Sequence, residues 1–154
     1  MKEVLVKKAI EVAKRSKANG NLAYGCVLAD GDGKVIMEGE NTVITEHDCL
    51  GHAEINLIRE ASKRYDTEFL SQCSIYTSDE PCPMCSSAIF WSGISTLVFG
   101  LSKSRFYQEF GNDNPAINFN IPSKDVLKAG GRKVKVIGPM LEDDVLAIHR
   151  SSSP

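Results

Sequence analysis

The sequence predicts an α/β protein in which one mixed sheet is covered by helices. Segments with helical apolar spacing and short strand-like runs follow each other in the order α-β-β-α-β-α-β-α-β-α. The 154 residues, 42% hydrophobic and 25% charged, are enough for a single domain with a proper core. We expect that domain over residues 1–150 and a frayed tail at residues 151–154.

The first three elements are expected to be a helix followed by a hairpin. Residues 2–18 carry apolar side chains at helical spacing among Lys and Glu, and Asn19-Gly20 supplies the stop. Two short apolar runs follow at residues 25–29 and 34–37. The intervening Asp30-Gly31-Asp32-Gly33 favours a tight turn, because glycine tolerates the positive φ that such turns require.

The central segments predict a helix, a strand, a helix and a strand. The helix at about residues 52–63 has apolar side chains on one face, and residues 73–77 form an apolar, β-branched run. The next helix is expected to open near Pro83 and to stop at Gly93. Residues 96–99 read as the fourth strand.

The last part begins with residues 102–122, a polar stretch rich in Asn, Phe and Gly. We expect it to be a long irregular loop and, since such loops are usually functional, a wall of the substrate site. Ser123 is expected to cap a short helix that ends at Gly130-Gly131. Residues 133–137 alternate as a fifth strand, and residues 141–149 form a terminal helix with acidic residues at its start.

Charge and cysteine content exclude several classes of protein. Eighteen basic and 20 acidic residues give a formal net charge of −2. This charge argues against a protein that binds a polyanion through its overall charge. No apolar run approaches the roughly 18 residues of a membrane span, and the N-terminus lacks an apolar targeting segment. We therefore expect a cytoplasmic protein. Its five cysteines are too few and too unevenly spaced for a disulfide scaffold.

Two short segments contain residues typical of a metal site: His52-Ala53-Glu54 and Pro81-Cys82-Pro83-Met84-Cys85. Each begins a predicted helix, and helix starts that follow strands gather at the carboxyl edge of an α/β sheet. One imidazole and two thiolates form a normal set of three protein ligands for Zn²⁺, with the fourth position left for water. His52, Cys82 and Cys85 are therefore the predicted ligands, and Zn²⁺ is the predicted cofactor.

Glu54 is the predicted catalytic residue. It stands two positions from His52, so it does not share the helical face of that ligand and suits work on the metal-bound water better than ligation. Zinc lowers the pKa of its bound water to about 7, and a nearby carboxylate can take the released proton and pass it on.

Two other interpretations of these residues remain open. A Cys-x-x-Cys pair can be a redox pair, and Cys49, near His52, can complete a structural four-ligand site. The combination of His-x-Glu with Pro-Cys-x-x-Cys, 30 positions later, is the signature of zinc deaminases, in which the Glu is the general acid and base.

On these two segments the chain resembles the cytidine deaminase-like superfamily. It is most similar to the branch that holds bacterial guanine deaminases, yeast-type cytosine deaminases and tRNA adenosine deaminases. The resemblance runs from the predicted strand at residues 25–29 to that at residues 133–137. It implies a three-layer α/β/α sandwich with a mixed five-stranded sheet, hydrolytic deamination, and a homodimer or larger homo-oligomer.

Several residues favour guanine deaminases within that branch. The segment Tyr76–Cys85 and the Ala88–Trp91 continuation are similar to their zinc-binding segment. The resemblance places Asn41, eleven positions before His52, against the base, and it places Tyr24 near the ring.

Asp113 falls where these enzymes carry an acidic residue that recognises the purine edge. The backbone N–H of Ala53 is expected to hold a substrate carbonyl. Trp91 is a candidate wall for the substrate ring. Three of these assignments have a structural alternative: a turn residue for Asn41, a solvated loop acid for Asp113, and core or dimer interface for Trp91.

The expected function is zinc-dependent hydrolytic deamination of a free nucleobase or similar small ring, with guanine favoured. The lead-in Glu46–Gly51 and the C-terminal Ile148–Ser151 depart from the guanine deaminase pattern, so cytosine or another nucleobase or nucleoside is the alternative. A tRNA adenosine deaminase is the other alternative. The basic residues are scattered along the sequence, which favours a small molecule over a nucleic acid as the partner.

Overall fold

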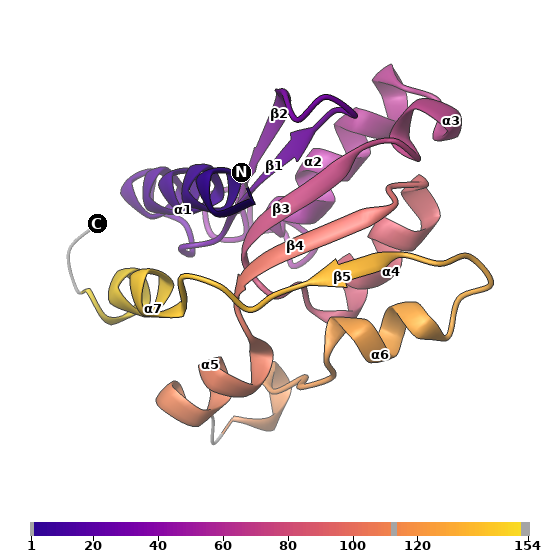
Figure 1. Cartoon of the computed structure of the whole chain (residues 1–154). Coiled ribbons are helices and arrows are strands. Elements are labelled where there is room, and N and C mark those ends of the chain that lie inside the picture. Colours follow the sequence, from indigo (N-terminus) through magenta and orange to yellow (C-terminus); the bar gives the residue numbers. More distant parts are fainter. Residues whose placement is uncertain (1, 112–113, 152–154) are drawn as a thin grey trace.

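The computed structural model describes residues 2–111 and 114–151. Five strands form one mixed sheet in the order β2-β1-β3-β4-β5. Strand β1 is antiparallel to both of its neighbours, whereas β3, β4 and β5 are parallel (Figure 1). The strands are β1 (Gly25–Ala29), β2 (Val35–Glu40), β3 (Ser74–Asp79), β4 (Thr96–Leu101) and β5 (Lys135–Ile137).

Helices cover both faces of the sheet, so the predicted three-layer α/β/α sandwich is confirmed (Figure 1). Helices α1 (Lys2–Ala18) and α7 (Glu142–Arg150) pack on one face. Helices α2 (Ala53–Arg64), α4 (Pro83–Ser92) and α6 (Ser123–Lys128) pack on the other.

Strand β1 shows how the two cores arise from one strand. Val27 and Ala29 point into the core beneath α1, while Cys26 and Leu28 point into the core beneath α2. Because both faces are buried, every residue of this strand is buried and its sequence does not alternate between apolar and polar.

The two predicted turns at the N-terminal end are confirmed. Gly20, directly after α1, has a φ of 93°, which only glycine adopts without strain. In the β1–β2 turn, the carboxylate of Asp30 accepts the backbone N–H groups of Asp32 and Lys34. Gly33 completes the turn with a φ of 84°.

The expectation that residues 102–122 are irregular is wrong. They contain helix α5 (Lys103–Phe110) and a short 3₁₀ helix, η1 (Pro115–Ile117). The Ser102 hydroxyl caps α5 by accepting the backbone N–H of Arg105. Phe106 and Phe110, one turn apart, lie with ring centres 5.0 Å from each other. The Ser102 cap and the i,i+4 pair of aromatic rings therefore stabilise a helix here, although the composition of the segment is typical of loops.

Three smaller differences concern short elements. Helix α3 (Thr67–Leu70) was not expected. Ser123 does not cap α6: Pro122 takes that position, and Ser123 is the first helical residue, its hydroxyl bonded elsewhere. Strand β5 begins two residues later than expected, at Lys135, whose N–H donates to Ser95.

The topology brings two helix starts to one edge of the sheet. Since β3 and β4 are parallel neighbours, their last residues, Asp79 and Leu101, are paired. The N–H of Glu80 extends this pairing by donating to the Leu101 carbonyl at 2.7 Å. Helices α4 and α5 therefore begin side by side. Within the described ranges, no helix combines the length and apolar character needed to cross a bilayer.

Candidate metal centre and active site

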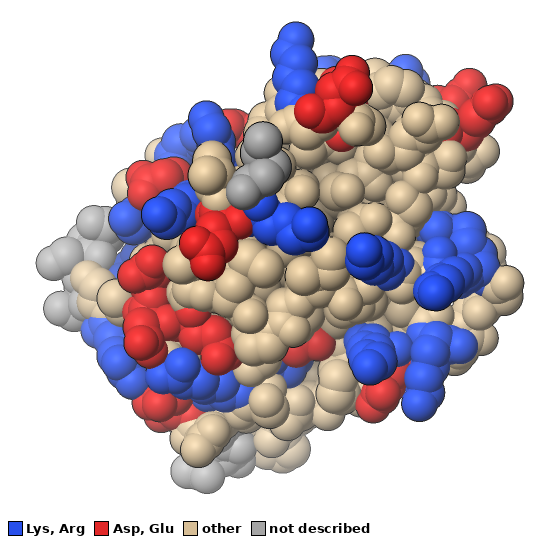
Figure 2. All heavy atoms as spheres, viewed as in Figure 1, with Lys and Arg blue, Asp and Glu red and all other residues tan. Residues whose placement is uncertain are grey.

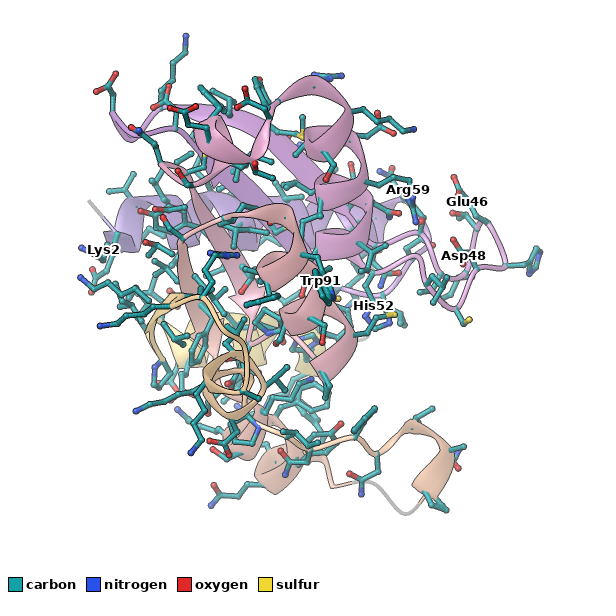
Figure 3. All side chains as sticks on the ribbon, turned by 90° about the vertical axis from the view of Figure 1, so that its right-hand side faces the viewer. Lys2, Glu46, Asp48, His52, Arg59 and Trp91 are labelled. Atoms are coloured by element: carbon teal, nitrogen blue, oxygen red, sulfur yellow. The ribbon has the colours of Figure 1, made fainter. Side chains whose placement is uncertain are left out.

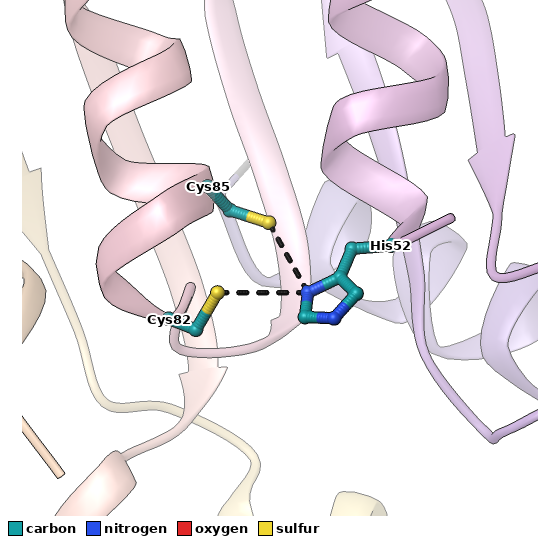
Figure 4. A group of neighbouring side chains, drawn as sticks. All are labelled: His52, Cys82 and Cys85. Carbon is teal, nitrogen blue, oxygen red and sulfur yellow. Dashed lines mark hydrogen bonds between the residues drawn. The ribbon is translucent and has the colours of Figure 1, made fainter. Parts of the chain in front are cut away.

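The three predicted ligands meet where α2 and α4 begin. His52 is the residue before α2 and Cys82 the residue before α4, while Cys85 lies in the first turn of α4. The His52 Nδ1 atom is 3.5 Å from the Sγ atoms of both cysteines (Figure 4). All three potential ligand atoms lie within 4.8 Å of one another.

These distances fit a zinc ion. Zn–S bonds of about 2.3 Å and Zn–N bonds of about 2.0–2.1 Å, at a tetrahedral angle, place nitrogen and sulfur about 3.5 Å apart. Cys85 is buried, whereas His52 and Cys82 are partly exposed, so the site is open on one side. Cys49 is exposed and does not belong to this cluster of described residues. The structural four-ligand alternative therefore lacks the fourth ligand that Cys49 was expected to supply.

The metal-free ligands share their protons unequally. The pKa of the Cys82 thiol is lowered to about 4, because its thiolate accepts hydrogen bonds from Cys85 and His52. The hydrogen bond to Cys82 and burial raise the pKa of Cys85 well above its ordinary value. The same thiolate raises the pKa of His52. One thiolate is thus already formed, and a metal must displace protons from its two neighbours.

We therefore expect zinc affinity to rise with pH. Cys85 and His52 hold their protons more tightly than usual, and zinc needs a thiolate and a neutral imidazole. Each displaced proton increases the apparent affinity about tenfold per pH unit below the pKa of its group. Competition with a chelator at pH 6, 7 and 8 measures this slope. An affinity that stayed constant over this range would contradict the assigned protonation states.

Glu54 lies beside the ligands in the first turn of α2 and is only 8% exposed. Its pKa is raised to about 7, first by burial and then by the negative charge of Cys82. The charges of His52 and Lys103 act in the opposite direction. A carboxyl group with a pKa near neutrality can both accept and donate a proton at physiological pH.

The structure places three of the predicted substrate-binding residues around this centre. Ala53 is the first residue of α2, where the helix leaves backbone N–H groups unpaired. Tyr24 precedes β1, and burial, followed by the negative charges of Asp79 and Glu54, raises its pKa. Asn41 is buried directly after β2, and its side-chain oxygen accepts the N–H of Val43 at 3.0 Å.

Asn41 therefore has the turn role that its sequence position suggested, and its side-chain nitrogen has no partner among the described residues. Trp91 is 79% exposed and lies six residues beyond Cys85 on α4. That position favours the interface alternative over a substrate wall within one chain. Asp113 lies outside the described residues.

One of the two segments that depart from the guanine deaminase pattern, Glu46–Gly51, belongs to an exposed loop. Figure 3 shows this loop, with Glu46 and Asp48, projecting from the body of the protein, and His52 at its inner end. Ile44 and Leu50 on the same loop are exposed apolar residues. The His52 side of the cluster is therefore bordered by one of the two segments that depart from that pattern.

Sequence reasoning missed Glu80, a buried carboxylate that supports the site. One oxygen accepts the N–H of Lys103, at the start of α5, at 2.8 Å. The other accepts the N–H and the hydroxyl of Ser123, at the start of α6, at 2.8 and 2.7 Å. The sequence feature that could have identified Glu80 is its position two residues before Cys82. Glu80 holds two helix starts against the segment that carries the ligands.

We expect Glu80→Gln to lower the free energy of unfolding by about 2–3 kcal/mol, because an amide presents N–H groups to backbone donors that need an acceptor. Urea unfolding of the zinc-loaded protein measures the change. Glu60→Gln is the matched control, since Glu60 is exposed and pairs with Lys63 on the same helix, and it is expected to change stability by less than about 0.5 kcal/mol. Equal effects of the two variants would contradict the assigned role.

Lys103 was also missed, because it fell in the expected loop. It is half-buried, and its ammonium group lies 5.9 Å from the centre of the Tyr107 ring. Its charge lowers the pKa of both Glu54 and His52, so it contributes positive potential to the site.

Comparison with known proteins agrees with the geometry. The family model for the cytidine and deoxycytidylate deaminase zinc-binding region matches residues 1–101. A probable cytosine deaminase of Schizosaccharomyces pombe is 36% identical over 94% of this chain and 88% of its own length. The guanine deaminase of Bacillus subtilis is 35% identical over 78% of this chain and 82% of its own.

Solved structures and shorter matches extend this comparison. The guanine deaminase of Nitrosomonas europaea is 25% identical, with a TM-score of 0.79 over 96% of this chain and 82% of that one. The tRNA-specific adenosine deaminase of Haemophilus influenzae is 38% identical over 65% of this chain and 58% of its own length. The chain therefore belongs to the cytidine and deoxycytidylate deaminase zinc-binding family, and its fold is that of the cytidine deaminase-like proteins.

Proposed function

We propose that this protein is a zinc-dependent aminohydrolase that deaminates a free nucleobase, with guanine as the first substrate, converted with water to xanthine and ammonia. One observation supports this most strongly. The buried carboxyl group of Glu54, with a pKa of about 7, stands next to a cluster of one imidazole and two thiols whose spacing suits zinc. The zinc-binding family to which the chain belongs supplies the reaction class.

His52, Cys82 and Cys85 would hold the ion, which when bound lowers the pKa of a water molecule to about 7. Glu54 accepts the proton of the attacking water. It delivers that proton to the ring nitrogen next to the amine-bearing carbon as the hydroxide adds to that carbon. It then takes the second proton from the added hydroxyl group and delivers it to the amine, which leaves as ammonia while the hydroxyl oxygen becomes the ring carbonyl. A single carboxyl group serves both steps because its pKa lies near the working pH.

The remaining predicted residues would orient the ring. Tyr24 offers an aromatic wall, and the free side-chain nitrogen of Asn41 offers a donor to a ring acceptor. The unpaired N–H of Ala53 suits a substrate carbonyl oxygen. Asp113 remains a proposed acceptor for ring N–H groups.

Support for guanine comes from the Bacillus and Nitrosomonas guanine deaminases. Support for cytosine, the second candidate, comes from the probable cytosine deaminase of fission yeast, which matches 94% of this chain against 78% for the Bacillus guanine deaminase. Both reactions use the same proton transfers by Glu54. The choice between guanine and cytosine therefore depends on which ring the substrate-binding residues accommodate.

The deciding experiment is a substrate panel. The zinc-loaded protein is incubated with guanine, cytosine, adenine, their nucleosides and amino-triazines, and ammonia release is measured. We expect release from guanine. Release from another ring only would overturn the choice of guanine and leave the mechanism standing. A protein that released ammonia from none of these compounds would refute the proposed function.

The position of the basic residues argues against a tRNA substrate. On the face shown in Figure 2, Lys and Arg alternate with Asp and Glu on the left and stand with few acidic neighbours on the right, over the region of α6 and β5. Lys135 pairs with Thr96 at the amino end of β4, whereas the metal ligands follow the carboxyl end of β3. Filter binding of tRNA at physiological salt tests this argument: we expect weak binding, and tight binding would favour the tRNA alternative.

Two further parts of the proposal are a homodimer or larger homo-oligomer and a cytoplasmic location. The exposed indole of Trp91 suits an interface between copies better than contact with solvent. All five cysteines are free, as expected in a reducing compartment. Analytical ultracentrifugation of the protein and of Trp91→Ala would measure the first of these.

A further inference from the structure

His149, on the C-terminal helix α7, makes a buried hydrogen bond with Asp79, the last residue of β3. Its Nε2 atom lies 2.6 Å from the Oδ2 atom of Asp79, and the two side chains are only 10% and 11% exposed. Asp79 stands three residues before Cys82. The bond therefore connects the last helix of the chain to the strand that leads into the metal ligands.

The other oxygen of Asp79 extends this connection to the start of β1. The Ser78 hydroxyl donates to Asp79 Oδ1 at 2.7 Å, and the same hydroxyl oxygen accepts the N–H of Gly25 at 3.1 Å. Gly25 directly follows Tyr24, the predicted ring-stacking residue. A continuous path of hydrogen bonds thus runs from α7, through the end of β3, to the backbone beside Tyr24.

The imidazole ring of His149 also contacts Tyr24 directly. The two ring centres are 5.2 Å apart with planes inclined at 49°. On its other sides the imidazole meets Phe106 at 5.4 Å and Phe110 at 6.0 Å, both on α5. Tyr24 is close enough to Glu54 for that carboxylate to raise the pKa of its hydroxyl. Tyr24 therefore contacts His149 directly and lies within the electrostatic influence of the proposed catalytic carboxyl group.

Anchoring α7 does not require this polar pair. Val145, Leu146 and Ile148 on the same helix are already buried in the core beneath α1. Burial of two ionisable side chains carries a desolvation cost, and apolar residues of similar volume are often as stabilising or more so. The His149–Asp79 pair is therefore better explained by the orientation that it gives to the side chains around it than by a contribution to the packing of α7 on the sheet.

We propose that His149 is a positioning residue of the active site, which fixes Asp79 and Tyr24 so that Tyr24 forms the wall against which the substrate ring stacks. The C-terminal helix is then part of the site of its own chain. The contact of Tyr24 with a substrate ring rests on the proposed function, whereas the positioning of Tyr24 by His149 does not.

The first test therefore needs no substrate. Hydrogen exchange of the zinc-loaded protein is compared for wild type, His149→Leu and His149→Gln. In His149→Leu, we expect the Gly25 amide to exchange about tenfold faster, since one buried hydrogen bond of the path to it is lost. His149→Gln, which keeps a side-chain N–H donor, restores slow exchange, and the α7 amides of Val145 and Leu146 stay unchanged in both variants.

Two results would overturn the proposal. Unchanged exchange at Gly25 in His149→Leu would show that the path does not hold this segment. Equal acceleration at Gly25 and in α7 would show that His149 merely docks the helix. Arg150→Gln is the matched control: it removes an exposed ion pair with Glu109 from the same turn of α7 and is expected to change neither region.

The second test uses turnover of whichever amine the substrate panel identifies. A misplaced wall weakens binding more than it slows the chemical step, so His149→Leu should raise KM about tenfold and change kcat by less than about threefold. A fall in kcat at unchanged KM would overturn the proposal. If wild type deaminates nothing, the proposed function fails, while hydrogen exchange still decides the role of His149.

Discussion

Replacement of Glu54 by Gln is expected to abolish nearly all ammonia release while zinc stays bound at one ion per chain. The amide cannot accept or deliver the proton on which both halves of the reaction depend, and general acid and base catalysis accounts for about 10²–10⁴ in rate. Since one group serves in two steps here, we expect a loss of at least about 10³-fold in kcat. Steady-state ammonia release and metal analysis of the same sample measure both quantities.

The zinc-free form of the same variant gives an independent measurement. The pKa of Glu54 in the folded protein, about 7, exceeds its ordinary value of about 4.3, so ionisation opposes folding. This opposition is absent below about pH 4, grows as the pH rises toward 7 and is complete above it. Glu54→Gln should therefore stabilise the zinc-free protein at pH 7.5 by about 2–3 kcal/mol and have little effect at pH 4.

Glu60→Gln, on the exposed side of the same helix, is the control for both measurements. A Glu54→Gln variant that kept substantial turnover would refute the proposed mechanism. A variant that lost its zinc together with its activity would instead make Glu54 a metal ligand. Loss of turnover without the gain in stability would show that the buried carboxyl is already neutralised by another group.

The metal ligands were predictable from the sequence because short spacing fixes their geometry. Cys82 and Cys85 are three residues apart at the start of one helix, so local structure alone places both thiols on the same side. His52 needed only the topological rule that helix starts gather at the carboxyl edge of the parallel strands. The structure confirms that these three side chains meet.

Contacts between distant segments could not be predicted in the same way. Asp79 and His149 are 70 residues apart in the sequence, and nothing local to either residue indicates the other. Glu80 serves α5 and α6, and one of these helices was hidden by a loop-like composition. The sequence predicts the cluster of His52, Cys82 and Cys85 and the neighbouring Glu54, whereas the residues that support this cluster become visible only in the folded chain.

Replacement of Cys82 by Ser is expected to remove zinc and activity together. Mutation of a residue that hydrogen-bonds to a metal ligand typically lowers metal affinity 10- to 100-fold. Loss of a direct ligand should therefore lower zinc affinity by more than about 100-fold. Cys82 is the more sensitive of the two cysteines to test, because it carries the thiolate that already exists at neutral pH, with a pKa of about 4. A serine hydroxyl cannot supply that charge at the start of α4.

The loss should be measured as an affinity rather than as an expression level. Chelator competition at pH 7.5, with circular dichroism to confirm the fold, separates a missing ligand from a misfolded chain. Cys49→Ser is the control, since Cys49 is exposed and lies outside the cluster, and it should bind zinc like wild type. If Cys82→Ser and Cys49→Ser both lost zinc, the ligand set would be the structural four-ligand alternative, and the open position that deamination needs would be lost. If both bound normally, zinc would lie elsewhere. Retained zinc with lost turnover in Cys82→Ser would instead mean that the thiolate acts on the reaction and not on the metal.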